Sequence, residues 1–238
     1  MHFRSAFLAA LAALIVPLSA HAVNVTDVRR ALSGLRGETP VSIAVNSVDQ
    51  RSDGKQNGES RGSSILEDDG TNIRLVYAKK ALAPKDQKKR GADHSIAPAD
   101  AAELLNYAPS LLKLMEGATI KRTAITAWNG RSATVIEIEP VREKDPDGDK
   151  WVKAYEDALT LWVGADGVPL AAHHNLHIKA RIVVVGFELK QDDDLQFERV
   201  NDRLVVTKRT TTSSGSGLGQ SENGTKTITA TIAPAVTR

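Results

Sequence analysis

The sequence predicts an α+β protein built on one strongly curved antiparallel β-sheet of about nine or ten strands, with helices across the concave face. Most of the chain alternates apolar and polar residues, which is the period of a strand with one buried face. Short turns such as Asn129-Gly130 separate these segments, so neighbouring strands must pair antiparallel. Helical spacing of apolar residues occurs in residues 25–35 and 98–116, an N-terminal helix and a mid-chain helical insertion.

The composition excludes several classes of protein. The 238 residues include no cysteine, and 41% of them are apolar, which excludes disulfide-stapled scaffolds and wholesale disorder. The 31 basic and 29 acidic residues nearly balance, whereas a general nucleic-acid binder has a strong basic excess. We therefore expect no nucleic-acid partner and a fold held by packing and sheet hydrogen bonds.

The first 22 residues have the pattern of a cleaved export signal. Arg4 supplies a positive charge, residues 6–18 are apolar, and residues 19–22 offer the small side chains that signal peptidase selects. The apolar run is shorter than the roughly 20 residues that a membrane-spanning helix needs. We expect residues 1–22 to be removed, residues 23–238 to form a single domain, and the protein to be periplasmic.

The first half of the chain begins with the helix at 25–35, which Asn24 or Thr26 can cap and Gly37 can end. Three strands follow. The first alternates over 41–46, and the others lie at 60–67 and 71–78, joined by a hairpin loop at 53–58 and a turn at Asp69-Gly70. A basic segment, residues 79–90, interrupts the alternation. In the helical insertion at 98–116, Pro109 is expected to divide the helix in two, because proline disrupts a helix interior.

The second half reads as four hairpins. The first pairs 119–128 with 132–139, and the second pairs 156–163 with 168–179. The third is expected to pair 181–190 with 195–200 through an acidic turn at 192–194. The fourth is expected to pair 202–212 with 225–232 through a Ser/Gly-rich loop at 213–224.

Two of these strands are apolar on both faces. Leu159 and Leu161 face one way while Trp162 faces the other, and residues 182–185 are apolar throughout. A sheet with two apolar faces must be covered on both sides, or it encloses something apolar.

The order of elements resembles the LolA-like superfamily of periplasmic half-barrel proteins, which includes lipoprotein carriers and envelope sensors. The most specific match is the segment LTLWV at 159–163, followed by DGVPL at 166–170. It is similar to the strand–turn–strand of that superfamily, with its aromatic residue, tight turn and proline. The resemblance implies a half-barrel fold with a hydrophobic cavity that holds acyl chains between the sheet and the helices.

The leading hypothesis is a non-enzymatic periplasmic protein that binds an acyl chain, such as that of a lipoprotein, or another apolar ligand in this cavity. The candidate lining residues are Trp128, Trp162, Leu161, Val183, Val185, Leu111 and Met115, although ordinary core is the simpler interpretation of each one taken singly. The alternative is an envelope sensor or assembly module with a filled core. It would dock on a membrane surface or an envelope protein through Lys79, Lys80, Lys85, Lys88, Lys89 and Arg90.

One acidic group has the spacing of calcium ligands. Asp145, Asp147, Asp149 and Glu156 match positions 1, 3, 5 and 12 of a calcium loop. However, Lys150 stands where that loop requires glycine, so a solvated acidic turn is the simpler interpretation.

The remaining polar clusters favour structural roles. On a strand, His173 and His177 lie about 13 Å apart, too far to share a metal ion, and His174 faces the other way. Glu137 and Glu139 face the strand that carries Lys121 and Arg122, which indicates cross-strand ion pairs. Gly215, Gly217 and Gly219 lack the lysine and the helix of a phosphate loop. No cofactor and no enzymatic activity are therefore expected.

Overall fold

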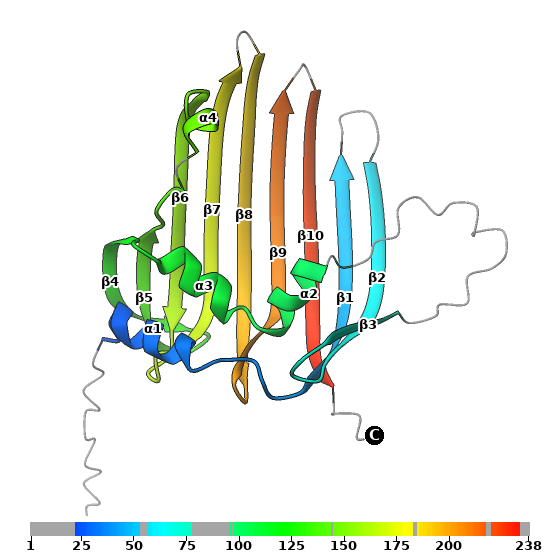
Figure 1. Ribbon diagram of the computed structural model, residues 1–238, viewed down its shortest axis with the longest axis vertical. Coiled ribbons are helices and arrows are strands. Elements are labelled where there is room, and N and C mark those ends of the chain that lie inside the picture. Colours follow the sequence, from blue (N-terminus) through cyan, green and yellow to red (C-terminus); the bar gives the residue numbers. More distant parts are fainter. Residues whose placement is uncertain are drawn as a thin grey trace, which may run out of the picture.

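The computed structural model describes residues 22–52, 57–77, 96, 98–143, 145–182, 185–217 and 220–233. Ten strands form a single sheet in the order β3-β2-β1-β10-β9-β8-β7-β6-β5-β4, and every neighbouring pair is antiparallel (Figure 1). The sheet does not close, since β3 and β4 remain its edges. The predicted α+β architecture, a curved half-barrel with helices, is confirmed.

The strands vary in length, and the longest lie in the middle of the sheet. They are β1 (Val41–Ser52), β2 (Asn57–Asp68), β3 (Ile73–Tyr77), β4 (Thr119–Trp128), β5 (Arg131–Glu139), β6 (Val152–Val163), β7 (Pro169–Ile182), β8 (Val185–Val200), β9 (Arg203–Gly217) and β10 (Gln220–Ala233).

Local sequence explains where the helices begin and end. Helix α1 (Val25–Ser33) starts at Asn24, whose side chain accepts a hydrogen bond from the Asp27 backbone in a capping box. Helix α2 (Pro98–Leu105) and helix α3 (Ala108–Met115) are separate. Pro109 lies in the first turn of α3, where a backbone N–H has no partner within the helix, so the N–H that proline lacks is not needed. The predicted division of the insertion is thus confirmed. A fourth, short helix α4 (Pro146–Asp149) precedes β6.

Helices α1, α2 and α3 lie across one face of the sheet, over one half of the long strands (Figure 1). Between helices and sheet is a dense core whose largest side chains are less than 2% exposed. Its members include Leu32, Leu104, Leu105, Leu111 and Met115 from the helices, and Ile43, Leu66, Ile136, Leu161 and Leu204 from the sheet. Burying each such side chain contributes roughly 1.5–3 kcal/mol, which fixes the helices on this face.

The third predicted turn is wrong. Residues 192–194 lie inside β8, which runs unbroken from Val185 to Val200. Neighbouring strands supply partners for all three carboxylates: His173 for Asp194, Asn175 for Asp192, and Arg209 for Asp193. Because each carboxylate has a hydrogen-bond partner on a neighbouring strand, the strand does not need to turn there.

The predicted Ser/Gly-rich loop at 213–224 is also wrong for most of its length. Strand β9 continues to Gly217 and β10 begins at Gln220, and the two pair through Gln220 opposite Gly217. Serine and glycine are small enough to pack in paired strand ends, although their composition is typical of loops.

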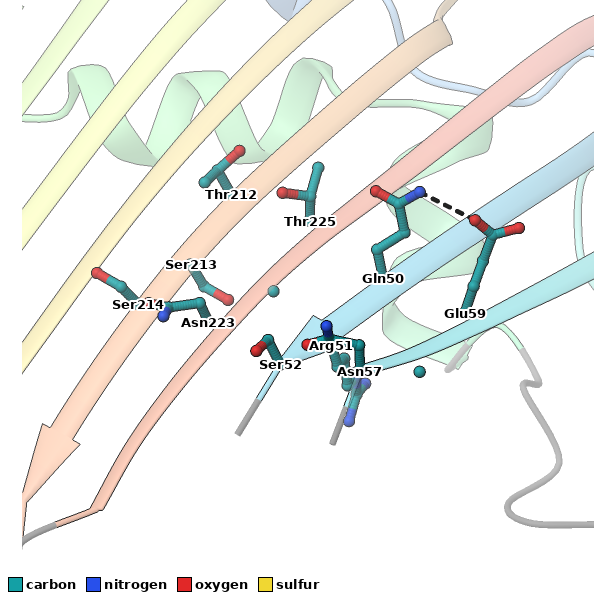
Figure 2. Close-up of a pocket in the computed structure, with 12 residues that line it drawn as sticks. Gln50, Arg51, Ser52, Asn57, Glu59, Thr212, Ser213, Ser214, Asn223 and Thr225 are labelled. Carbon is teal, nitrogen blue, oxygen red and sulfur yellow. Dashed lines mark hydrogen bonds between the residues drawn. The ribbon is translucent and has the colours of Figure 1, made fainter. Parts of the chain in front are cut away.

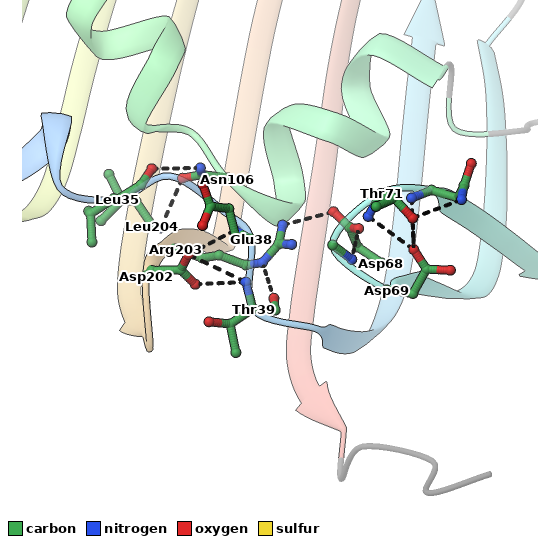
Figure 3. Close-up of polar contacts among 12 residues, drawn as sticks. Leu35, Glu38, Thr39, Asp68, Asp69, Thr71, Asn106, Asp202, Arg203 and Leu204 are labelled. Carbon is green, nitrogen blue, oxygen red and sulfur yellow. Dashed lines mark hydrogen bonds and ion pairs between the residues drawn. The ribbon is translucent and has the colours of Figure 1, made fainter.

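A buried arginine joins distant parts of the chain beneath the helices (Figure 3). Arg203 is 2% exposed, and its Nη1 lies 2.8 Å from Asp68 Oδ2 while its Nε donates to the Thr39 carbonyl oxygen at 2.7 Å. The neighbouring Asp202 accepts from the backbone N–H groups of Glu38 and Thr39. These bonds tie the segment after α1 to the end of β2 and the start of β9.

Some predictions fall outside the described residues: positions 1–21 of the export signal predicted at 1–22, the basic residues Lys79, Lys80, Lys85, Lys88, Lys89 and Arg90, and the cavity candidate Val183. Among the helices that the structure does describe, none is both long and apolar enough to cross a bilayer.

Candidate functional site

The pairing register assigns each strand side chain to one of two faces. In β7, Ala172 belongs to the core, so His174, Leu176, Ile178 and Ala180 share the face that carries the helices. In β8, Leu195 belongs to the core, so residues 187, 189, 191 and 193 share this face as well. We call it the helix-bearing face and the opposite one the open face.

Beyond the helices, the helix-bearing face carries an apolar strip, which we define as Leu176, Ile178, Ala180, Leu189 and Phe187. Ile178 lies opposite Leu189 and Ala180 lies opposite Phe187, so the five side chains are contiguous on β7 and β8. Phe187 is 37% exposed and Leu189 is 40% exposed. Large apolar side chains gathered on one uncovered face indicate a contact surface for something apolar.

Two glycines of β9 border the strip. Gly217 lies opposite Phe187, and a Cβ placed there would be 2.6 Å from Phe187 Cδ1, so the ring lies over the glycine. Gly215 lies opposite Leu189, and a Cβ there would meet nothing within 4 Å. The glycines thus seat the aromatic ring at one position and leave free space beside the strip at the other.

Polar side chains, which we call the polar belt, border the strip on two sides. His174 lies opposite Asp193 on the core side of the strip, and Asp157 and Tyr155 of β6 lie opposite Leu176 and Ile178. His174 Nε2 lies 2.8 Å from Asp157 Oδ1, and the Tyr155 hydroxyl donates to Asp157 Oδ2 at 2.8 Å. Burial alone would raise the pKa of Asp157, but the bonds to His174 and Tyr155 outweigh it and lower that pKa. Burial and the bond to Asp157 raise the pKa of Tyr155 to about 12, so its hydroxyl stays protonated at neutral pH.

The belt continues on β8 and β9. Asp193, 2% exposed, accepts from Arg209 Nη2 at 3.1 Å and from the Thr211 hydroxyl, and Arg209 Nη1 reaches Glu103 of α2 at 3.0 Å. Burial alone would lower the pKa of Arg209, but Asp193 raises it above its ordinary value. The belt therefore anchors α2 on the sheet through charges that are paired with one another.

The predicted cavity residues are distributed over both faces. Leu161, Leu111 and Met115 come together in the core between the helices and the sheet, each fully buried. Val185 lies on the helix-bearing face, two residues before Phe187. Trp128 and Trp162 lie on the open face, where their ring centroids are 5.0 Å apart.

The strip itself was missed by sequence reasoning. The segment at 187–190 alternates Phe187 and Leu189 with Glu188 and Lys190, a clear signal of a strand with one apolar face. What the sequence could not indicate is that this face extends beyond the helices, because that depends on where 98–115 crosses the sheet.

The histidines and glutamates that the sequence singled out are held by ion pairs. His173 pairs with Asp194 at 2.9 Å and His177 with Glu188 at 2.9 Å on the open face. His174 lies on the opposite face from these two, as predicted, and that is the helix-bearing face. Arg122 lies 3.3 Å from Glu137, and Lys121 contacts Glu139, so the predicted cross-strand pairs are confirmed.

The acidic residues with calcium-loop spacing lie in different settings. Asp149 ends α4 and pairs with Arg142, while Glu156 lies within β6, 3.6 Å from His177. Asp145 precedes α4, and the side chain of Asp147 lies outside the described part of the chain. Among the described residues, no three His, Asp or Glu side chains are grouped as metal ligands.

No model of a known protein family and no curated protein matches the chain. Among solved structures, it is similar to a DUF1329 family protein from Desulfovibrio piger, with 13% identity, a TM-score of 0.41, and coverage of 90% of this chain and 94% of the other. It is also similar to a LolA superfamily protein from Nitrosomonas europaea, with 11% identity, a TM-score of 0.38, and coverage of 88% and 92%. Both are likenesses of fold between chains with little sequence identity.

Proposed function

We propose that this is a non-enzymatic periplasmic carrier that holds an acyl chain against the apolar strip, with the helix-covered core as the closed end of the site. The observation that carries the proposal is the exposure of Phe187 and Leu189 on the helix-bearing face. The periplasmic location rests on the export signal predicted at residues 1–22.

The shape of the strip suits an acyl chain. Leu176 to Ala180 spans about 13 Å along β7, and the strip is two strands wide with the free space over Gly215 beside it. A linear chain lying along the strands would cover it, and each methylene removed from water contributes about 0.8 kcal/mol.

The belt also supports the non-enzymatic part of the proposal. Asp157 is engaged by both His174 and Tyr155, and Asp193 by Arg209 and Thr211. A general base has to reach substrate, whereas these carboxylates are committed to partners within the protein.

The proposal is tested by native mass spectrometry of the protein purified without detergent, followed by titration with a fluorescent long-chain fatty acid. We expect a stoichiometric adduct of lipid mass and saturable binding of the probe. The double variant F187S/L189S should lose at least tenfold in affinity, because the strip then offers no large apolar side chain on β8.

The matched control is I120S/I125S, which removes two large apolar side chains that are 40% and 55% exposed on the edge strand β4, away from the strip. It should bind the probe like the parent protein. A bare mass together with no saturable probe binding would overturn the proposal, and equal loss in both double variants would show that the probe binds apolar surface unspecifically.

A further inference from the structure

A hollow lies on the open face, opposite the face that carries the helices (Figure 2). It has a volume of about 630 Å³ and spans the four adjacent strands β9, β10, β1 and β2. In β1, Ile43 and Val45 face the core, so Gln50 and Ser52 point to the open face.

Two rows of side chains form the walls of this hollow, which we call the polar groove. The register places Thr212, Thr225, Gln50 and Glu59 side by side in one row, one from each strand. It places Ser214, Asn223, Ser52 and Asn57 in the second row. The backbone of the residues between the rows, which include Gly224 and Gly58, forms the floor.

The chemistry of the walls is uniform. Seven of the eight wall side chains are uncharged hydroxyls or carboxamides, each able to donate and to accept hydrogen bonds. The exception, Glu59, accepts from Gln50 Nε2 at 3.0 Å and pairs with Arg61 at 2.7 Å. These two partners lower the pKa of Glu59. The side chains of Thr212, Thr225, Ser214 and Asn223 make no hydrogen bond to another described residue.

We propose that the polar groove binds a neutral oligosaccharide lying across the four strands. Sugar hydroxyls donate and accept hydrogen bonds as the wall side chains do, so the two surfaces are complementary. The groove is about 14 Å wide from β9 to β2, which accommodates a short linear oligosaccharide.

Other classes of ligand fit the groove less well. An acyl chain would find no large apolar side chain in the walls, and a nucleic acid would find no aromatic ring on which to stack its bases. Protein interfaces are rich in aromatic side chains and poor in serine, which is the reverse of this composition. An anion would need a free cation, whereas Arg51 pairs with Asp49 at 3.0 Å.

The test is a titration of the isotope-labelled protein with maltotetraose, cellotetraose and chitotetraose, followed by NMR of the side-chain amides of Gln50, Asn57 and Asn223. At least one of the three should shift these signals with a saturating curve. The variant T212V/T225V, which keeps the side-chain shape but removes two wall hydroxyls, should bind that sugar at least tenfold more weakly.

The matched control is T229V/T231V, which removes two hydroxyls from the same face of β10 outside the groove. It should bind as the parent does, and the strip variant F187S/L189S should as well, since the two sites lie on opposite faces. Melting temperatures of all variants establish that they fold. The proposal is overturned if none of the three sugars shifts the amides up to about 10 mM. It is equally overturned if T212V/T225V binds as tightly as T229V/T231V.

Discussion

Arg203 is a charged residue that water hardly reaches. Its side chain is 3% exposed and that of Asp68 is 11% exposed, and Arg203 Nη2 has no hydrogen-bond partner among the described residues. Nothing in the local sequence indicates this, because a charged residue after a turn normally faces solvent and its partners lie 135 and 164 residues away. Sequence periodicity depends on residues that are close in the chain, so it cannot predict these long-range contacts of Arg203.

We expect Arg203→Met to lower the free energy of unfolding by about 3 kcal/mol, because it leaves the Asp68 carboxylate buried without its cation. Urea denaturation measures the change. Arg61→Met, which removes an arginine that is 73% exposed, should cost less than about 1 kcal/mol. The double variant D68N/R203M should recover part of the loss, and failure to recover any would argue against an uncompensated charge as the cause.

Asp202 makes the same region sensitive to acid. The Thr39 side chain and the backbone N–H groups of Glu38 and Thr39 lower the pKa of Asp202 from 3.8 to about 2. A carboxylate with a depressed pKa contributes stability that is complete above about pH 4 and is lost as the pH falls toward 2.

The melting temperature of the parent protein should therefore fall between pH 4 and pH 2, and that of Asp202→Asn should fall less over this interval. Glu116→Gln, which neutralises an exposed carboxylate outside this turn, provides the control and should retain the parent's slope. Parallel curves for the parent and Asp202→Asn would contradict the assignment.

At the scale of the elements, the sequence predicts the features that residues close together in the chain determine. The two helices of the insertion form as expected. The hairpin turns also form as expected, and Asn129, Gly130 and Gly167 have positive φ there. The acidic segment of β8 could not be predicted, because the hydrogen-bond partners of its carboxylates, His173, Asn175 and Arg209, come from other strands. The sequence thus predicted which side chains of a strand share a face, but not how long the strand is.

Helix α2 depends on two contacts of unequal strength. Arg209 bridges Glu103 of α2 and the buried Asp193, whereas Lys226 reaches Asp100 of α2 at 3.3 Å with both side chains more than one third exposed. Buried, hydrogen-bonded pairs resist solvent competition, and exposed pairs contribute little.

We expect Arg209→Met to increase hydrogen exchange of the backbone amides at 98–105 at least tenfold, since it removes the bridge to α2 and leaves Asp193 without its cation. Lys226→Met should change the same amides by less than about threefold. Exchange in α1 provides the internal reference and should remain unchanged in both variants. If the two variants affected α2 equally, the buried bridge would not be the main anchor.

The whole molecule presents two uncovered surfaces with opposite chemistry. The helices cover one half of one face, which leaves the apolar strip on that face and the polar groove on the other. The sequence predicts the sheet, the helices and an apolar ligand. The location of both surfaces follows from the order of strands and the path of α2 and α3 across them, which no local pattern encodes.

Because the strip and the groove share no residue, ligands of the two sites should stabilise the protein independently. A ligand present at 100 times its Kd adds about 2.7 kcal/mol to the free energy of unfolding if it binds the native state alone. We expect a long-chain fatty acid to raise the melting temperature of the parent and of T212V/T225V equally, and to leave F187S/L189S unchanged. A neutral oligosaccharide should give the reverse pattern, and the two shifts should add in the parent when both ligands are present. A fatty-acid shift that survives in F187S/L189S would place the acyl chain elsewhere, and shifts that fail to add would mean that the two faces communicate through the sheet.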